Sequence, residues 1–130
     1  QGDARLEEAA RAALARTGLA DRAEALAATL SHGQKRALEI AMALAAEPKI
    51  ILFDEPVAGM SREETQRIVE LLASLKGRYA MLLVEHDMEA VFSLADRLSV
   101  LVYGRIVATG APDEIRANEE VRAHYIGEGE

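Results

Sequence analysis

The chain contains no cysteine and no tryptophan, and aromatic residues make up only 4% of its 130 residues. Without cysteine it can form neither a disulfide framework nor a thiolate metal site. The three histidines, His32, His86 and His124, are far apart in the sequence and do not have metal-ligand spacing. No segment reaches the roughly 18 consecutive apolar residues that a membrane-spanning helix needs. These absences predict a cytoplasmic domain that reaches a membrane only through a partner.

Basic residues are also scarce relative to acidic ones, with 15 against 22 and a net charge of −7. Nucleic-acid binders usually carry a basic stripe with interleaved aromatics, and this chain has none, so we expect no nucleic-acid partner. Half of the residues are apolar and 28% are charged, which favours a packed core over disorder. The apolar content is mainly alanine and leucine, which favours packed helices over a sandwich or barrel.

Periodicity and capping signals predict several elements along the chain. Expected helices are Asp3–Arg16 (ended by Gly18), Ala23–Ala28, Ser31 to about Ala46, a helix opened by Ser61 and Glu64 and ended by Gly77, Met88–Ala95, a turn starting at Pro112, and Glu119–Tyr125. Expected strands are Lys49–Phe53, buried on both faces, then Tyr79–Val84 parallel to it, and a hairpin of Leu98–Val102 and Arg105–Ala108 around Tyr103-Gly104. The tail from Gly127 to Glu130 is expected to fray.

The most informative stretch is the apolar run from Ile50 to Phe53, which is followed by Asp54, Glu55 and Pro56. A buried parallel strand delivers two adjacent carboxylates at its carboxyl end, where open α/β sheets bind ligands. One carboxylate can hold Mg²⁺, directly or through water, and the next can activate an attacking water. An acidic pair alone is more often a solvated turn.

The second strand ends in the same way, because Glu85, His86 and Asp87 follow Val84. Parallel strands of one sheet end on the same side, so His86 is expected to approach Asp54 and Glu55. An imidazole there can donate to a phosphate oxygen and help orient the water. A lone histidine at a strand end is more often structural.

Leu30-Ser31-His32-Gly33-Gln34 lies at the start of a long predicted helix. Free N–H groups and the helix dipole favour an anion there, the Ser31 hydroxyl adds a donor, and Gly33 allows close backbone approach. By itself the pattern is only a good helix cap.

The order and spacing of these three patterns strongly resemble the ATP-binding-cassette (ABC) ATPases, over essentially the whole chain. The resemblance implies that Ser31, His32, Gly33 and Gln34 form the signature motif, which contacts the ATP of a partner subunit. It makes Ile50–Asp54 the Walker B strand, with Asp54 supporting Mg²⁺, and Glu55 the catalytic base. Ala58, Gly59, Met60 and Ser61 would form the D-loop, and His86 would be the switch histidine.

Further strings resemble the bacterial cassettes of branched-chain amino acid and urea importers. They are His32 within the signature, Glu55-Pro56-Val57-Ala58-Gly59-Met60, Glu85-His86-Asp87-Met88, and the ending Val121–Gly127. Lipopolysaccharide-export cassettes share a similar ending, so the solute stays open. The family implies ATP and Mg²⁺ as ligands, a second ATPase subunit (identical or different) and membrane permease subunits as partners, and a location at the inner face of the membrane.

The phosphate-binding loop of such ATPases has the form Gly-x-x-x-x-Gly-Lys-Ser/Thr, and the chain contains no Gly-Lys pair. The resemblance therefore predicts a partial P-loop NTPase fold of the α/β class, with a parallel-strand core, flanking helices and a C-terminal hairpin. Residues 1–30 would belong to the helical subdomain and residues 31–130 to the C-terminal part of the core. The chain alone is expected to bind ATP and Mg²⁺ weakly, to be inactive, and to self-associate through exposed core surface.

Two other interpretations remain open. A truncated cassette can act only as a dimerisation or docking fragment without hydrolysis. An ABC ATPase of DNA repair or translation is a further possibility, although the acidic balance and the importer-like strings argue against it.

Overall fold

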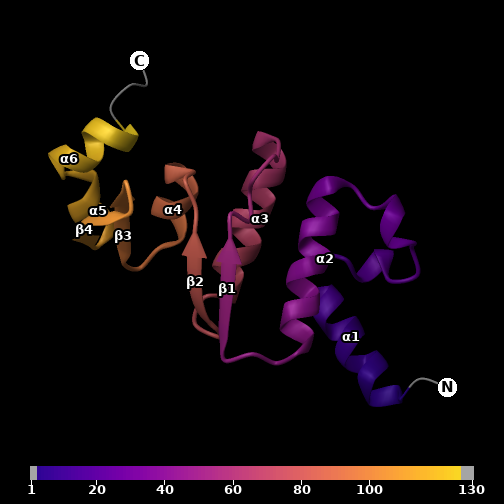
Figure 1. The fold of residues 1–130 in the computed structure, drawn as a ribbon. Helices are drawn as coiled ribbons and strands as arrows, with labels where there is room; N and C mark the ends of the chain where they lie inside the picture. Colours follow the sequence, from indigo (N-terminus) through magenta and orange to yellow (C-terminus); the bar gives the residue numbers. More distant parts are fainter. Residues whose placement is uncertain (1–2, 127–130) are drawn as a thin grey trace. The chain divides into compact units, whose positions relative to one another are not determined.

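The computed structural model describes residues 3–126 and divides the chain into two compact units, Gln1–Val84 and Glu85–Glu130. Each unit is described by itself (Figure 1). The tail Gly127–Glu130, which is predicted to fray, lies outside the described residues. Within residues 3–126, no helix has the length and apolar character needed to cross a bilayer.

Helix α1, Ala4–Arg16, opens the first unit and agrees with the predicted helix. The Asp3 side chain caps it by accepting the Arg5 N–H at 2.9 Å, and the chain turns away at Gly18, whose φ is 75°. The helix predicted over Ala23–Ala28 is wrong. The structure has two short 3-10 turns in this region, Ala20–Arg22 and Ala27–Thr29. An alanine-rich run this short does not offset the free-energy cost of nucleating an α-helix.

Helices α2, His32–Ala45, and α3, Arg62–Leu75, both begin with a capping box. In each box a serine accepts the N–H of the residue three positions later, and that residue's side chain accepts the serine N–H. The buried side chains of these two packed helices are Ala37, Ile40, Ala41, Leu44, Ile68, Leu72 and Leu75. The predicted apolar stripe of α3 is thus confirmed, with Leu71 half-buried at its edge.

Strands β1, Ile50–Asp54, and β2, Ala80–Val84, pair in parallel, as predicted. Ile50 is opposite Ala80, and Asp54 is opposite Val84. Figure 1 shows the two arrows side by side, pointing the same way, with α3 following the carboxyl end of β1. Both strands therefore end at the same edge of the sheet.

One face of this sheet is uncovered, so the prediction of a strand buried on both faces is wrong. In β1, Ile51 and Phe53 are buried while the alternate side chains are exposed. We call the exposed apolar set the open face: Ile50 (64% exposed), Leu52 (71%), Leu82 (59%) and Val84 (56%). The helices of the unit bury only one side of the strands, and an all-apolar run cannot reveal which side that is.

The second unit contains α4, Met88–Leu94, the antiparallel strands β3, Leu98–Val102, and β4, Arg105–Gly110, then α5, Pro112–Arg116, and α6, Glu119–Val121. A turn with π-helical bonding, Arg122–Ile126, continues α6. The predicted hairpin is confirmed, although β4 runs to Gly110 and a bulge interrupts the register after Val100. Pro112 occupies the start of α5, also as predicted.

The core of this unit is small and apolar. It consists of the buried residues Leu98, Val100, Ile115 and Val121, with half-buried neighbours from α4 and both strands packed against them. The Arg116 guanidinium lies 4.6 Å from the centre of the Phe92 ring, which links α5 to α4 through a cation–π contact.

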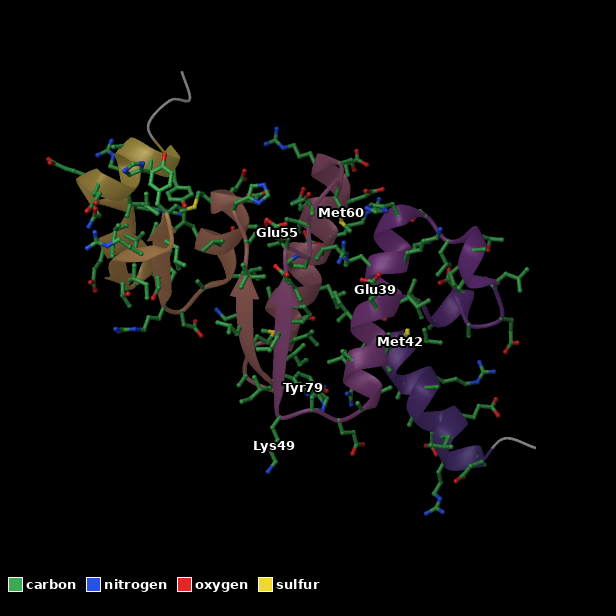
Figure 2. All side chains as sticks on the ribbon, in the orientation of Figure 1. Glu39, Met42, Lys49, Glu55, Met60 and Tyr79 are labelled. Carbon is green, nitrogen blue, oxygen red and sulfur yellow. The ribbon has the colours of Figure 1, made fainter. Side chains whose placement is uncertain are left out.

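The three tyrosines have different surroundings. Tyr79, labelled in Figure 2, belongs to the first unit, and its hydroxyl accepts a hydrogen bond of 2.9 Å from Arg16 Nη1. Tyr125 belongs to the second unit and donates its hydroxyl hydrogen to the carbonyl oxygen of Leu101. Tyr103 occupies the hairpin turn and is 98% exposed.

Candidate functional site

The acidic pair lies at the carboxyl end of β1. Asp54 is the last residue of the strand, Glu55 follows it, and both side chains are exposed. Glu55 is labelled in Figure 2. The Glu55 N–H donates to the Val84 carbonyl at 2.7 Å, which continues the parallel ladder by one bond beyond the strand. Glu55 has a φ of 49°. A glutamate in this left-handed region is strained, and such strain gathers at functional sites.

The chain after Glu55 forms a tight, hydrogen-bonded loop. The Ala58 N–H donates to the Glu55 carbonyl at 3.1 Å, and the Met60 N–H donates to the Val57 carbonyl at 3.3 Å. Gly59, at a φ of 71°, takes a conformation that glycine adopts without strain. The loop leads directly into the cap of α3, so the predicted loop residues Gly59, Met60 and Ser61 are held between two ordered elements.

The start of α2 presents backbone donors. The Ser31 Oγ accepts the Gln34 N–H at 3.2 Å, and the Gln34 side chain accepts the Ser31 N–H at 3.0 Å. Helix geometry leaves the N–H groups of His32 and Gly33 without an intrahelical acceptor. The hydroxyl hydrogen of Ser31 can still be donated, because a hydroxyl both donates and accepts. Residues Ser31–Gln34 thus form a partly exposed helix start suited to an anion.

The structure brings the starts of α2 and α3 together, which the sequence does not predict. A Cβ placed on Gly33 would lie 3.3 Å from Glu64 Cγ, and one placed on Gly59 would lie 3.9 Å from His32 Nε2. The first distance is closer than ordinary van der Waals contact. The Glu64 side chain therefore lies against the helix start of α2, a contact that the sequence does not predict. The capping-box pattern identified Glu64 only as a helix residue.

His86 lies in the second unit, two residues after the end of β2. Its side chain is 73% exposed, and its Nδ1 is 3.7 Å from Oε1 of Glu85, whose side chain is 1% exposed. The same oxygen accepts the N–H groups of His86 at 3.1 Å and Asp87 at 3.4 Å, and Asp87 caps α4 through the Ala90 N–H. Glu85 therefore fixes the backbone around His86. The approach of His86 to Asp54 and Glu55 stays a prediction.

The residues present fit a Mg²⁺ ion held mainly by phosphate and water. Within residues 3–126, no group of three or more histidine or acidic side chains could enclose a metal. Asp54 offers one exposed carboxylate at the end of β1. Mg²⁺ commonly takes one or two protein carboxylates and completes its shell with phosphate oxygens and water. Asp54 is the residue that would hold the ion, through a water molecule.

The parallel pairing of β1 and β2, with carboxylates at the carboxyl edge, places the chain in the α/β class, in which open sheets bind ligands at that edge. Family comparisons agree with this class. Residues 3–58 match the model of the ABC transporter family, and residues 105–130 match that of the branched-chain amino acid ATP-binding cassette transporters.

Individual relatives include the high-affinity branched-chain amino acid transport ATP-binding protein LivG of Salmonella typhimurium, 41% identical over 117 residues. That alignment covers 88% of this chain and 46% of LivG. The lipopolysaccharide export ATP-binding protein LptB of Haemophilus influenzae is 36% identical over 104 residues, covering 79% of this chain and 43% of LptB. The chain spans about half the length of the curated relatives it matches.

Solved structures agree as well. An ATP-binding cassette of an ABC transporter in its ADP conformation matches with a TM-score of 0.86 and 30% identity, over 98% of this chain and 52% of that one. CbiO1 from Clostridium perfringens matches with a TM-score of 0.80 and 31% identity, over 90% of this chain and 47% of CbiO1. The chain belongs to the family of ABC transporter ATP-binding proteins, and its fold is a partial ABC ATPase fold of the α/β class.

Proposed function

We propose that this chain supplies the hydrolytic residues and the partner-facing helix start of an ATP-hydrolysing cassette that drives an ABC importer. The observation that carries the proposal is the placement of Asp54 and Glu55 at the carboxyl end of β1, with Glu55 held in a strained conformation. Family membership supports it. The activity belongs to the intact cassette, which includes a phosphate-binding loop, and the predicted inactivity of residues 1–130 alone is part of the proposal.

Each candidate residue has a role that its position supports. Glu55 accepts a proton from the attacking water, and Asp54 supports Mg²⁺, which when bound offsets the charge of the β- and γ-phosphates. His86 donates to a γ-phosphate oxygen. The roles of Glu55 and His86 raise turnover by stabilising the charge that develops in the transition state.

The helix start at Ser31–Gln34 serves the ATP held by a second cassette subunit, identical or different. Its open N–H groups and the exposed Ser31 suit contact with an anion across an interface. The loop Gly59–Ser61 lies beside it and would share that interface. Membrane permease subunits would hold the two cassette subunits at the inner face of the membrane. Hydrolysis can move a solute only if the opening of the cassette dimer is coupled to a change in the permease subunits.

We propose branched-chain or other hydrophobic amino acids, or urea, as the solute class. Support comes from the likeness to LivG and from the match of residues 105–130 to the branched-chain amino acid cassettes. The similarity to LptB makes lipopolysaccharide export the second candidate. Restoring leucine uptake to cells that lack their own importer cassettes would support import. Rescue of lipopolysaccharide export alone would favour the second candidate.

The test of the hydrolytic role is Glu55→Gln in the intact cassette. Removing a positioned general base costs on the order of 100-fold or more in kcat, and ATP should then hold two subunits together in a stable dimer. Glu70→Gln, an exposed change on α3 with the same loss of charge, is the matched control. Turnover of the Glu55 variant at the unmodified rate would exclude Glu55 as the base.

A further inference from the structure

We infer that Glu64 is a positioning residue that fixes the start of α2 against the Gly59–Ser61 loop, by filling the space beside Gly33. The inference rests on the proposed roles of Ser31–Gln34 and Gly59–Ser61. It assigns a function to a contact that neither the acidic pair nor the helix caps explain, and it adds a steric reason for glycine at position 33 to the close anion approach that glycine allows there.

The contact between the two helix starts is reciprocal. The Glu64 side chain, from α3, lies beside Gly33 of α2, with Cγ 3.3 Å and Cδ 3.6 Å from the position that a Cβ would take. In the other direction, His32 Nε2 of α2 lies 3.9 Å from the position that a Cβ on Gly59 would take. Both segments belong to the first unit, and α2 packs on α3. Each segment therefore limits where the other can move.

Glu64 is also fixed at its other end. Its Oε2 accepts the Ser61 N–H at 3.3 Å, while its own N–H donates to Ser61 Oγ at 3.2 Å. The carboxylate is thereby tied to the last residue of the Gly59–Ser61 loop, and the methylene groups are left against Gly33. One side chain joins the loop to the helix start, so both keep a defined relative position before nucleotide arrives.

Glycine at position 33 has no conformational explanation of its own. Gly33 is not among the residues with positive φ, and alanine is the better helix former by about 1 kcal/mol. A Cβ at position 33 would lie 3.3 Å from Glu64 Cγ, so the Glu64 side chain, which is bonded to Ser61, would have to shift by a few tenths of an ångström to accept alanine.

Gln34 supplies the matched comparison for the charge of Glu64. It occupies the equivalent position of the α2 capping box and accepts the Ser31 N–H through an amide oxygen. Glu64→Gln should therefore keep the bond to the Ser61 N–H and the methylene groups beside Gly33, whereas Glu64→Ala removes both and keeps only the backbone N–H bond to Ser61 Oγ. Glu63→Ala deletes an exposed acidic side chain of the same first turn that takes no part in the capping box, so it controls for charge.

The experiment compares Gly33→Ala, Glu64→Ala, Glu64→Gln, Glu63→Ala and the Gly33→Ala/Glu64→Ala double variant in the intact cassette. Measurements are the thermal midpoint without nucleotide, and kcat and KM for ATP. We expect Glu64→Gln and Glu63→Ala to match the unmodified protein. Gly33→Ala and Glu64→Ala should each lower kcat by about 3- to 10-fold, with less change in KM, as expected when alignment and not ground-state binding is lost.

The double variant decides the inference. Removing the Glu64 side chain makes room for a Cβ at position 33. The losses of thermal midpoint and kcat in the double variant should therefore be smaller than the sum of the two single losses, a non-additive result typical of residues in contact. Additive losses in both would overturn the inference. The thermal midpoints measure the effect of the contact on stability, independently of ATP turnover. Failure of the proposed function would instead appear as turnover that Glu55→Gln leaves unchanged.

Discussion

Glu55 combines an exposed carboxylate with a strained backbone, and the two properties have opposite consequences for stability and activity. A left-handed conformation costs a non-glycine residue about 1–2 kcal/mol. The Glu55 N–H bond to Val84 at 2.7 Å holds it there. The sequence predicted the position of the carboxylate but not its backbone angle, because residue type alone says little about a φ that neighbouring strands impose.

We therefore predict that Glu55→Asn stabilises this chain by about 1 kcal/mol, since asparagine tolerates positive φ, although the proposed base is lost. Urea unfolding measures the change. Asp54→Asn removes a neighbouring exposed carboxylate at a residue without positive φ and should leave stability nearly unchanged. Equal effects of the two changes would point to relief of charge repulsion and would contradict the strain argument.

At the scale of single elements, the capping signals in the sequence predict the starts of two helices correctly. Ser31 with Gln34 and Ser61 with Glu64 form capping boxes in the structure, and α2 and α3 begin immediately after the two serines. The incorrect prediction of a helix over Ala23–Ala28 shows that alanine content alone does not predict a helix. Its alanines favour helix, but the Thr29 hydroxyl bonds back to the Leu26 carbonyl at 2.6 Å, and only a 3-10 turn forms.

Removing the cap of α3 should destabilise the protein. We expect Ser61→Ala to lower the free energy of unfolding by about 1 kcal/mol, because the Glu64 N–H loses its acceptor. Ser74 lies near the other end of the same helix and bonds to the Leu71 carbonyl at 2.6 Å. Ser74→Ala should be neutral or slightly stabilising, and a loss equal to that of Ser61→Ala would contradict the capping role.

The hairpin turn offers a second change at this scale. Tyr103 and Gly104 both have positive φ, 49° and 75°, as a type I′ turn requires. Asparagine favours the first of these positions, so Tyr103→Asn should stabilise the second unit by about 0.5–1 kcal/mol. Gly104→Ala should destabilise it, although open space surrounds Gly104. Thermal unfolding measures both, and a neutral Gly104→Ala would rule out the assigned turn type.

At the scale of the whole chain, the open face is the property that the sequence could not predict. The apolar run Ile50–Phe53 gives the same pattern whether one or both faces are covered, so exposure depends on what packs against the strands. Ile50, Leu52, Leu82 and Val84 remain exposed. Within the described residues, each of these strands pairs only with the other, so their outer edges are open too.

We predict that the 130-residue chain associates with itself through the open face, because contiguous exposed apolar surface favours association. Burying one leucine contributes about 1.5–3 kcal/mol. Leu52→Thr with Leu82→Thr should lower the association measured by sedimentation over a range of concentrations. Leu26→Thr changes an exposed leucine in a loop and should have no effect. A native chain that is monomeric at every concentration would contradict this prediction.

Isothermal titration of the 130-residue chain with Mg-ATP should show no binding tighter than millimolar, because a phosphate nest and its lysine supply most of the affinity. The same titration on the intact cassette is the control. Micromolar binding by the chain would show that Ser31–Gln34 or the acidic edge holds nucleotide without that loop.

The absence of tryptophan gives the tyrosines a practical value as optical probes. Tyr79 and Tyr125 are hydrogen-bonded in the first and second units, respectively, whereas Tyr103 is solvated in the native state. Replacing Tyr103 and one other tyrosine by phenylalanine leaves a single reporter whose emission follows one unit. Coincident denaturation curves for the two reporters would mean that the units unfold as one cooperative block, and separate curves would mean that each unit unfolds independently.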